Sequence, residues 1–288
     1  MSGLFLVGAG AAGSALGLAA ARAGVEIVGV CDSSREAARS LAADLGAPAF
    51  CPEMPPSLSA AELVLVAVPD TEIDEVARRA AERGLAREHQ VWLHCAGRLG
   101  AAALAPLEGV VRGTGALHPA RVFPPGGGAT LPPGTVFAVD CRGEAIHETQ
   151  RLVEALGGEL IEVPAELRPA YHAATVIASN YAVALIDAAL SAAEGLERRG
   201  LERLLISLAG GAVEAVARRG VDAALSGPIR RGDADAVATH LERLRDRPLE
   251  RDLYIAAGRL VLRIAARSDE SDPDRLRRVA AVLEAGDR

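Results

Sequence analysis

The chain has 288 residues, enough for one large domain or two ordinary domains with a substantial core. Its formal net charge of −7 at pH 7 excludes the extended basic surface that is typical of nucleic-acid-binding proteins. The 31 basic residues are all arginines, so no lysine is present to form a Schiff base or to act as a general acid.

The cysteines and the apolar segments predict a cytoplasmic protein. Cys31, Cys51, Cys95 and Cys141 lack the spacing of a metal site and indicate free thiols in a reducing compartment. The N-terminus starts as an apolar strand, without the basic segment that opens a signal peptide. Polar residues interrupt the longest apolar stretch, residues 173–193, which therefore predicts a buried helix rather than a membrane span.

A glycine-rich turn follows the first apolar run, residues 4–7. That run predicts a strand, and the motif GAGAAG leads from it directly into an Ala- and Leu-rich helix. In a GxGxxG turn the first glycine makes the tight turn, the second lets a pyrophosphate approach, and the third lets helix and strand pack closely. We predict a dinucleotide site whose phosphates are held by Gly8, Gly10, Ala11, Ala12 and Gly13.

The second predicted strand, residues 25–30, is followed by Asp32, roughly 20 residues beyond the glycines, where an acidic side chain can bind the adenosine ribose. A carboxylate there favours NAD because it would repel a 2′-phosphate. Ser33, Ser34 and Arg35 could instead hold that phosphate if Asp32 turned away. The sequence therefore leaves NAD and NADP both open.

The elements that follow alternate between strands and helices up to about residue 163. Helices are predicted at 34–45, 72–83 and 145–156, and strands at 63–68, 91–93, 111–117, 136–139 and 159–163. The near-continuous apolar runs are typical of parallel strands buried on both faces. This pattern predicts an open, mostly parallel, doubly wound sheet of the Rossmann type.

From residue 166 onward only helical patterns remain. Helices are expected at 169–197, 201–218, 233–245, 249–266 and 274–284. We therefore predict two domains, a dinucleotide-binding domain at 1–164 and an all-helical substrate and dimerisation domain at 165–288. The Pro- and Gly-rich segment 124–134 could be a mobile flap at the edge of the sheet or a plain surface loop.

Candidate site residues follow the ends of the strands, where ligands bind in open α/β sheets. We predict that the cofactor contacts one set after residue 66 and another after residue 93: Val68, Pro69, Asp70, His94, Cys95, Ala96 and Gly97. His118 is a candidate acid or base and Arg121 a candidate anchor for an anionic substrate. The histidines could instead bind loop carbonyls only. Cys95 is not expected to be a nucleophile, since its neighbour His94 should point away from it.

A second polar group lies on the long apolar helix predicted at 169–197. His172, Thr175 and Ser179 recur at helical spacing, with Asn180 beside them. Such a stripe indicates either a substrate or cofactor contact or a hydrogen-bonded seam between helices. Arg230, in the turn 226–233, could bind a substrate carboxylate or be a surface charge.

Several motifs resemble one known family. They are GAGAAG at 8–13, VAVPD at 66–70, HCAG at 94–97, ALHPARVFP at 116–124, YHAATVIASNY at 171–181 and GPIRRGD at 227–233. They resemble the family in which a Rossmann-like domain precedes domain of unknown function 2520, whose members are often named as NADP oxidoreductases. The domain plan is also similar to that of ketopantoate reductase, pyrroline-5-carboxylate reductase, prephenate dehydrogenase and 6-phosphogluconate dehydrogenase.

This resemblance implies a nicotinamide cofactor on the first domain, a small-molecule substrate between the domains, and a homodimer formed through a helical domain like that of 6-phosphogluconate dehydrogenase. The pair His118-Pro119 is similar to one in prephenate dehydrogenases, where the histidine is catalytic. The lysine used by ketopantoate reductase and 6-phosphogluconate dehydrogenase is absent here. Proton transfer would then depend on His118, His172, or a water held by Ser179 and Asn180.

The favoured hypothesis is therefore an NAD(P)-dependent oxidoreductase that acts on a small, anionic carbonyl, imine or hydroxy compound. No membrane, nucleic-acid or metal partner is expected. The alternative is a non-catalytic dinucleotide-binding protein that senses redox state or acts as a scaffold. A deazaflavin-linked enzyme is a third hypothesis.

Overall fold

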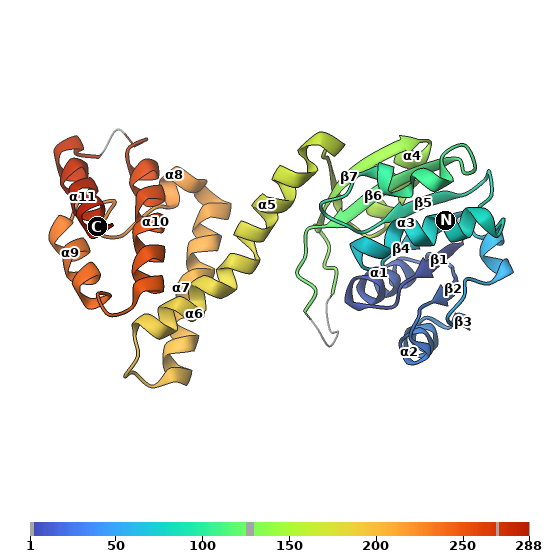
Figure 1. Cartoon of the computed structure of the whole chain (residues 1–288), viewed down its shortest axis with the longest axis horizontal. Coiled ribbons are helices and arrows are strands. Elements are labelled where there is room, and N and C mark those ends of the chain that lie inside the picture. The colour runs from blue at the N-terminus through green and yellow to red at the C-terminus, as the bar shows by residue number, and fades with distance from the viewer. Residues whose placement is uncertain (1–2, 125–129, 269–270, 288) are drawn as a thin grey trace. The chain divides into compact units, whose positions relative to one another are not determined.

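The computed structural model describes residues 3–124, 130–268 and 271–287 (Figure 1). The chain divides into two compact units, Met1–Ser179 and Asn180–Arg288. The first unit thus extends past residue 164, where the sequence places the domain boundary, and the division at 164 stays a prediction. Of the segment 124–134, residues 125–129 lie outside the described residues.

An eight-stranded sheet, in the order β3-β2-β1-β4-β5-β6-β7-β8, forms the centre of the first unit. Adjacent strands are parallel, except that β6 and β7 are antiparallel. The strands are β1 Leu4–Val7, β2 Ile27–Cys31, β3 Ala49–Phe50, β4 Leu63–Val66, β5 Val91–His94, β6 Gly113–Pro119, β7 Val136–Gly143 and β8 Glu159–Glu162. The mostly parallel, doubly wound fold predicted from the sequence is confirmed.

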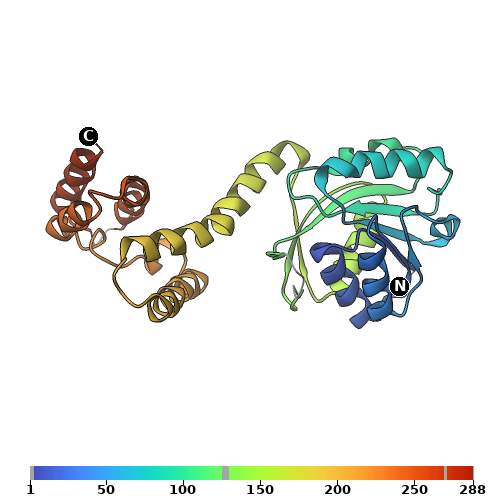
Figure 2. The same ribbon diagram turned by 60° about the horizontal axis from the view of Figure 1, so that its bottom comes forward.

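Helices cover both faces of this sheet because successive strand residues point to opposite sides. Leu4 and Leu6 pack toward α1 (Ala11–Arg22), α2 (Arg35–Leu45) and α4 (Ala145–Ala155). Phe5 and Val7 pack toward α3 (Ile73–Glu82) and the 3₁₀ helix η3 (Ala101–Leu107). Figure 2 shows α1 and α2, in blue, across the sheet from α3, in cyan. The helices are α1 Ala11–Arg22, α2 Arg35–Leu45, α3 Ile73–Glu82, α4 Ala145–Ala155 and α5 Arg168–Ala178, with 3₁₀ helices η1 Pro56–Ala60, η2 Asp70–Glu72, η3 Ala101–Leu107 and η4 Ala165–Leu167.

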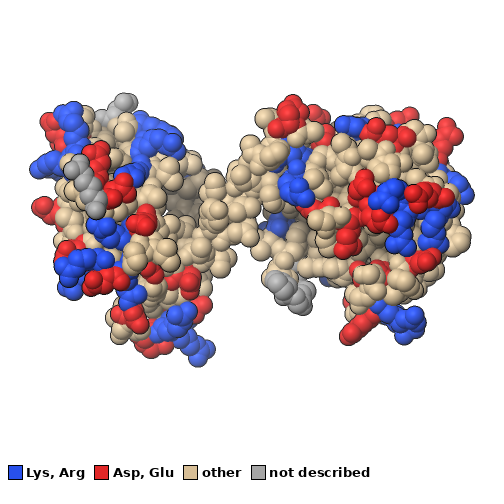
Figure 3. Space-filling model, viewed as in Figure 1, with Lys and Arg blue, Asp and Glu red and all other residues tan. Residues whose placement is uncertain are grey.

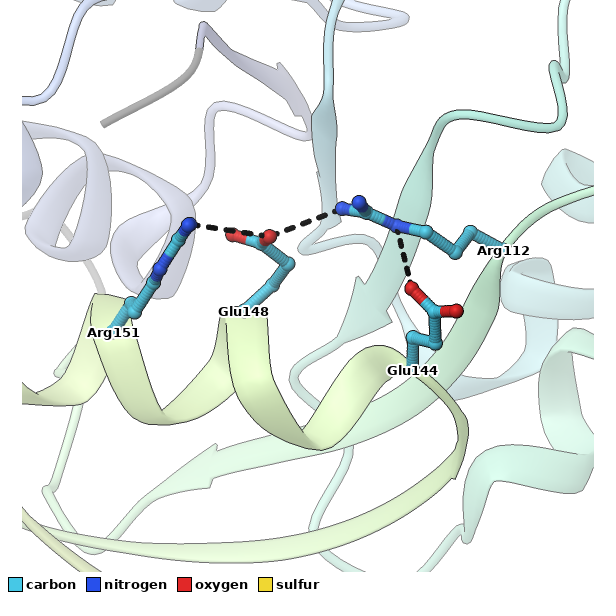
Figure 4. A network of polar contacts seen from close by, with 4 residues as sticks. All are labelled: Arg112, Glu144, Glu148 and Arg151. Carbon is cyan, nitrogen blue, oxygen red and sulfur yellow. Dashed lines mark hydrogen bonds and ion pairs between the residues drawn. The ribbon is translucent and has the colours of Figure 1, made fainter.

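A charged network secures the start of α4 (Figure 4). Glu148, with a side chain that is 14% exposed, accepts a hydrogen bond from Arg112 at 3.0 Å and a longer one from Arg151 at 3.4 Å. Arg112 also faces Glu144 at 3.7 Å. Arg112 directly precedes β6, so the network lies at the end of β6 opposite to His118 and supports the fold rather than the candidate site.

The second unit is helical, as predicted. Its helices are α6 Asn180–Ala192, α7 Arg198–Arg219, α8 Val221–Ala224, α9 Ala234–Arg243, α10 Pro248–Ala265 and α11 Pro273–Gly286. A small core of Ile229, Val237, Ile255, Val279 and Leu283 joins α9, α10 and α11. The single long helix predicted at 169–197 is instead two helices, because the backbone bends at Ser179 (φ −115°, ψ −67°).

The apolar stretch predicted to be a buried helix is exposed, so that prediction is wrong. Within Ala165–Ala192 the most apolar window of 18 residues has a mean hydropathy of 1.5, so the segment is long and apolar enough to cross a membrane, yet only 6% of that window is buried. Figure 3 shows few charged atoms over α5 and α6 on the face in view. Apolar character predicts burial only when the covering partner belongs to the same chain.

Candidate functional site

The turn between β1 and α1 has the close backbone approaches that its glycines allow. Gly8 has φ +106°, and a Cβ built on it would lie 2.4 Å from the carbonyl oxygen of Ala67. A Cβ on Gly13 would lie 2.1 Å from the carbonyl oxygen of Gly8. A side chain at either position would therefore disrupt the turn.

The N-terminus of α1 is open to an incoming ligand. Nothing lies within 4 Å of a Cβ built on Gly10, and none of the described side chains caps this N-terminus. The amides of Ala11 and Ala12 are in the first turn, where backbone N–H groups attract an anion. We call this turn the phosphate cradle; its binding of a dinucleotide pyrophosphate stays a prediction.

Asp32 is fixed between two turns. One carboxylate oxygen accepts a hydrogen bond from the amide of Ala9 at 2.7 Å, and the other accepts one from the amide of Ser34 at 2.7 Å. The Ser34 hydroxyl accepts from the amide of Ala37 and caps α2. Asp32 thus joins the β1–α1 turn to the β2–α2 turn.

A cleft of about 250 Å³ lies beside these turns. Among the predicted cofactor ligands it is lined by Gly8, Gly10, Asp32, Ser33, Val68 and Pro69, together with Glu72 and Arg79, which the sequence analysis did not select. Arg35 is exposed and does not line it. Asp70 also lies outside the lining and pairs with Arg98 at 3.0 Å.

His94 and Cys95 are held by the protein itself. His94 is fully buried; its Nε2 contacts the carbonyl of Gly100 at 2.9 Å and its Nδ1 accepts from the amide of Ala96. Burial lowers the pKa of His94, which keeps the ring neutral. Burial raises the pKa of Cys95 to about 12, so its thiol stays protonated and is a poor nucleophile. All four cysteines are free, as predicted.

His118 and His172 meet over Gly97. A Cβ built on Gly97 would lie 3.0 Å from Nε2 of His118 and 3.0 Å from Nδ1 of His172. Nδ1 of His118 is hydrogen-bonded to the hydroxyl of Tyr171 at 2.7 Å, and the two rings meet edge to face. The carboxyl ends of β5 and β6 and the first turns of α5 thus bring together two imidazoles and a phenol.

A buried cation lies beneath this cluster. Arg168 is fully buried, and its guanidinium donates to the carbonyls of Ala96 and Gly97 at 3.4 Å and of Ala138 at 3.3 Å. Its Nε has no hydrogen-bond partner among the described residues. Burial, and then the charges of Arg168 and His172, lower the pKa of His118 to about 4, so this imidazole is neutral at pH 7.

The other predicted residues contribute less to this cluster. Thr175 and Ser179 donate hydrogen bonds to the carbonyls of His172 and Thr175 in their own helix. Arg121 is exposed. Arg230 belongs to the second unit, where it donates to the hydroxyls of Ser268 and Ser271.

Sequence reasoning missed Arg168 and Tyr171 as site residues. Tyr171 is immediately before His172, and its hydroxyl could have been grouped with it. Arg168 carries no comparable signal, because its location under the histidines depends on how η4 and α5 pack against β5 and β7. Long-range packing, not local pattern, identifies it.

The fold and the site define a Rossmann-like protein with a cleft beside its glycine-rich turn and a histidine–tyrosine cluster at the same edge of its sheet. A family model for a Rossmann-like domain matches residues 3–119, and the model for domain of unknown function 2520 matches residues 135–261. These two matches confirm the resemblance predicted from the motifs: the chain combines a Rossmann-like domain with domain of unknown function 2520. No match was found among curated proteins.

Solved structures agree with this assignment. A protein of Thermotoga maritima is 25% identical with a TM-score of 0.70, and the match covers 92% of this chain and 98% of that one. A candidate NADP oxidoreductase from Bacteroides fragilis is 25% identical with a TM-score of 0.65, covering 90% and 96%. An imine reductase from a Pseudomonas species shares the fold at 17% identity and a TM-score of 0.63, covering 99% of each chain.

Proposed function

We propose that this protein is an NAD(P)-dependent oxidoreductase that transfers a hydride between the nicotinamide and a small, anionic carbonyl, imine or hydroxy compound. The observation that carries the proposal is the pairing of His118 with Tyr171 at the sheet edge that also holds the glycine-rich turn. Relatives named as NADP oxidoreductase and imine reductase support the same class of reaction.

The phosphate cradle and His118 are separated by a distance that a bound dinucleotide can span. In the sheet order, β4 and β5 separate β1, which precedes the phosphate cradle, from β6, which carries His118 at its carboxyl end. At ~4.8 Å per strand this is about 14 Å, which an extended dinucleotide can span. The cradle around Gly8 and Gly10 would hold the pyrophosphate, and Asp32 would accept from the adenosine ribose.

The bound cofactor would supply or accept the hydride, and the protein would handle the proton. Burial raises the pKa of Tyr171 and lowers that of His118, so near pH 7 the pair consists of a protonated phenol and a neutral imidazole. In reduction, Tyr171 gives its proton to the substrate oxygen or nitrogen and regains one from Nδ1–H of His118, while Nε2 takes a proton from water. Oxidation reverses these steps.

The surroundings of His118 favour an anionic substrate group. The charge of Arg168 is buried under the two imidazoles, where the low dielectric strengthens its attraction for an anion. Arg168 is fully buried and would act at a distance, as a positioning residue. Direct contact with a substrate carboxylate would fall to His172, or to Arg121 on the surface.

The proposal is tested by binding and turnover measured separately. NAD+, NADH, NADP+ and NADPH are each added in a thermal unfolding assay, in which a ligand at 100 times its Kd adds about 2.7 kcal/mol of stability. Oxidation of the preferred reduced cofactor is then followed with a panel of cyclic imines and 2-oxo acids. Tyr171→Phe and His118→Asn should bind the cofactor like the wild type and lose turnover. Binding without turnover of any panel member would favour the non-catalytic alternative.

We also propose that the second unit forms a homodimer through α6 and α7. None of the described residues of α7 is buried, although several of its side chains are large and apolar. Ile206, Leu208 and Val213 are 55%, 65% and 70% exposed. A second copy would cover this surface. The membrane alternative is disfavoured because Arg168 and Tyr171, at the start of the apolar stretch, are bonded within the first unit. Cytoplasmic location stays a prediction.

Sedimentation velocity tests the dimer. The wild type should sediment as a dimer, and Leu208→Arg combined with Val213→Arg should sediment as a folded monomer. Glu214→Gln, on the same helix and exposed, is the matched control and should leave the dimer intact. A monomeric wild type would contradict the proposal.

A further inference from the structure

The cleft beside the glycine-rich turn carries more negative than positive side chains. Asp32 and Glu72 line it, and Arg79 is the single cation among its lining residues. Asp32 directly follows β2, and Glu72 directly precedes α3. Two carboxylates therefore face the space in which the adenosine ribose of a dinucleotide would bind.

The carboxylate of Asp32 is not free to turn away. Each of its oxygens accepts a backbone hydrogen bond of 2.7 Å, one from Ala9 and one from Ser34. Rotating the side chain would break both bonds and release both turns. A carboxylate has about four acceptor positions, so two remain for the hydroxyls of a ribose.

Few groups in the cleft could hold a 2′-phosphate. The Ser34 hydroxyl caps α2 and its amide is bonded to Asp32. Arg35 does not line the cleft. Ser33 lines it, but its hydroxyl is a neutral donor that does not balance the charge of a phosphate. Arg79 is the one cation in the lining, and it shares the lining with Glu72.

We propose that this cleft selects NAD(H) over NADP(H), with Asp32 as the specificity-determining residue and Glu72 strengthening the selection. The ribose diol donates to the fixed carboxylate, whereas a 2′-phosphate would lie against it and be repelled. This inference rests on the proposed dinucleotide function. It sets the chain apart from the relative of Bacteroides fragilis that is named for NADP.

Isothermal titration calorimetry of the full chain tests the selection with two matched pairs, NAD+ against NADP+ and 5′-AMP against adenosine 2′,5′-bisphosphate. Wild type should bind the member without the 2′-phosphate at least about tenfold more tightly in each pair. Asp32→Asn should reduce that ratio. Glu72→Gln, which leaves the Asp32 bonds intact, should reduce it by about threefold. Glu82, the last residue of α3, is exposed and lies outside the cleft, so Glu82→Gln should not change the ratio.

Tighter or equal binding of NADP+ by the wild type would overturn the inference and leave the proposed function standing. If the wild type prefers NADP+, Arg79→Gln shows why. A loss of NADP+ affinity with NAD+ affinity unchanged in that variant would assign the 2′-phosphate to Arg79 and overturn the inference. If the wild type binds none of the four ligands, the dinucleotide function fails and the inference fails with it.

Discussion

The neutral state of His118 should make the first unit lose stability as the pH falls. Burial and the nearby charge of Arg168 lower its pKa from 6.5 to about 4 in the folded protein. Above pH 6.5 neither the folded nor the unfolded chain protonates this ring. Between pH 6.5 and 4 the unfolded chain takes up a proton that the folded chain refuses, so the free energy of unfolding decreases. Below pH 4 both states are protonated and this contribution is constant.

The size of the effect follows from the shift. At 1.36 kcal/mol per pKa unit, a shift from 6.5 to about 4 corresponds to at most about 3 kcal/mol. The ring is partly exposed, and solvent screening reduces that value. His94 is also held neutral by burial and adds a loss of the same sign, so a comparison with a variant is needed to isolate His118.

Urea unfolding between pH 7.5 and 4 provides that comparison. The chain has one tryptophan, Trp92, fully buried on β5, so its fluorescence reports on the first unit. His118→Asn keeps a polar group next to Tyr171 but cannot titrate. Wild type should lose about 1 to 3 kcal/mol more than this variant over the range. Parallel curves, or a His118 ring that titrates near pH 6.5 by NMR, would refute the reasoning.

Two further predictions test the packing of the site and of the fold. Gly97→Ala puts a methyl group 3.0 Å from both imidazoles, so we expect kcat/KM to fall at least about tenfold. Unchanged turnover would show that the two rings do not act on the substrate. Glu148→Gln removes the charge that two arginines share and should lower the free energy of unfolding by about 1–2 kcal/mol. The control Glu214→Gln, in an exposed pair, should lower it by less than about 0.5 kcal/mol. Equal small losses in urea unfolding would mean that the network on α4 contributes little.

The fold could be predicted because its signals are local. The apolar run at 63–68, the glycine-rich turn and the cap at Ser34 each specify their own element, and the structure has strand, turn and helix there. The antiparallel direction of β7 was not predicted, since alternation of residues along a strand is the same in either direction. The bend at Ser179 was not predicted either, because no glycine or proline lies next to it in the sequence.

The candidate site was predictable only in part. The glycines and Asp32 directly follow strands and His118 lies at the carboxyl end of β6, and strand ends converge in any parallel sheet. Tyr171 lies 53 residues after its partner His118, and Arg168 lies 72 residues after Ala96. Their places depend on how one helix packs on the finished sheet. The burial predicted for the apolar stretch 173–193 was wrong for a related reason, because the sequence does not show whether the covering partner belongs to the same chain.

These contacts divide the work of the site between the two matched domains in a specific way. The Rossmann-like match ends at residue 119, directly after His118, and the match to domain of unknown function 2520 begins at residue 135, so it contains β7 and α5. Tyr171, His172 and Arg168 thus come from the second match, although they lie in the first compact unit. The Rossmann-like part would bind the cofactor and offer a single histidine. The segment of unknown function would add the phenol that pairs with that histidine, and a buried cation that adds to the effect of burial in lowering the pKa of the histidine. On this reasoning its role is to turn a binding fold into one that can move a proton.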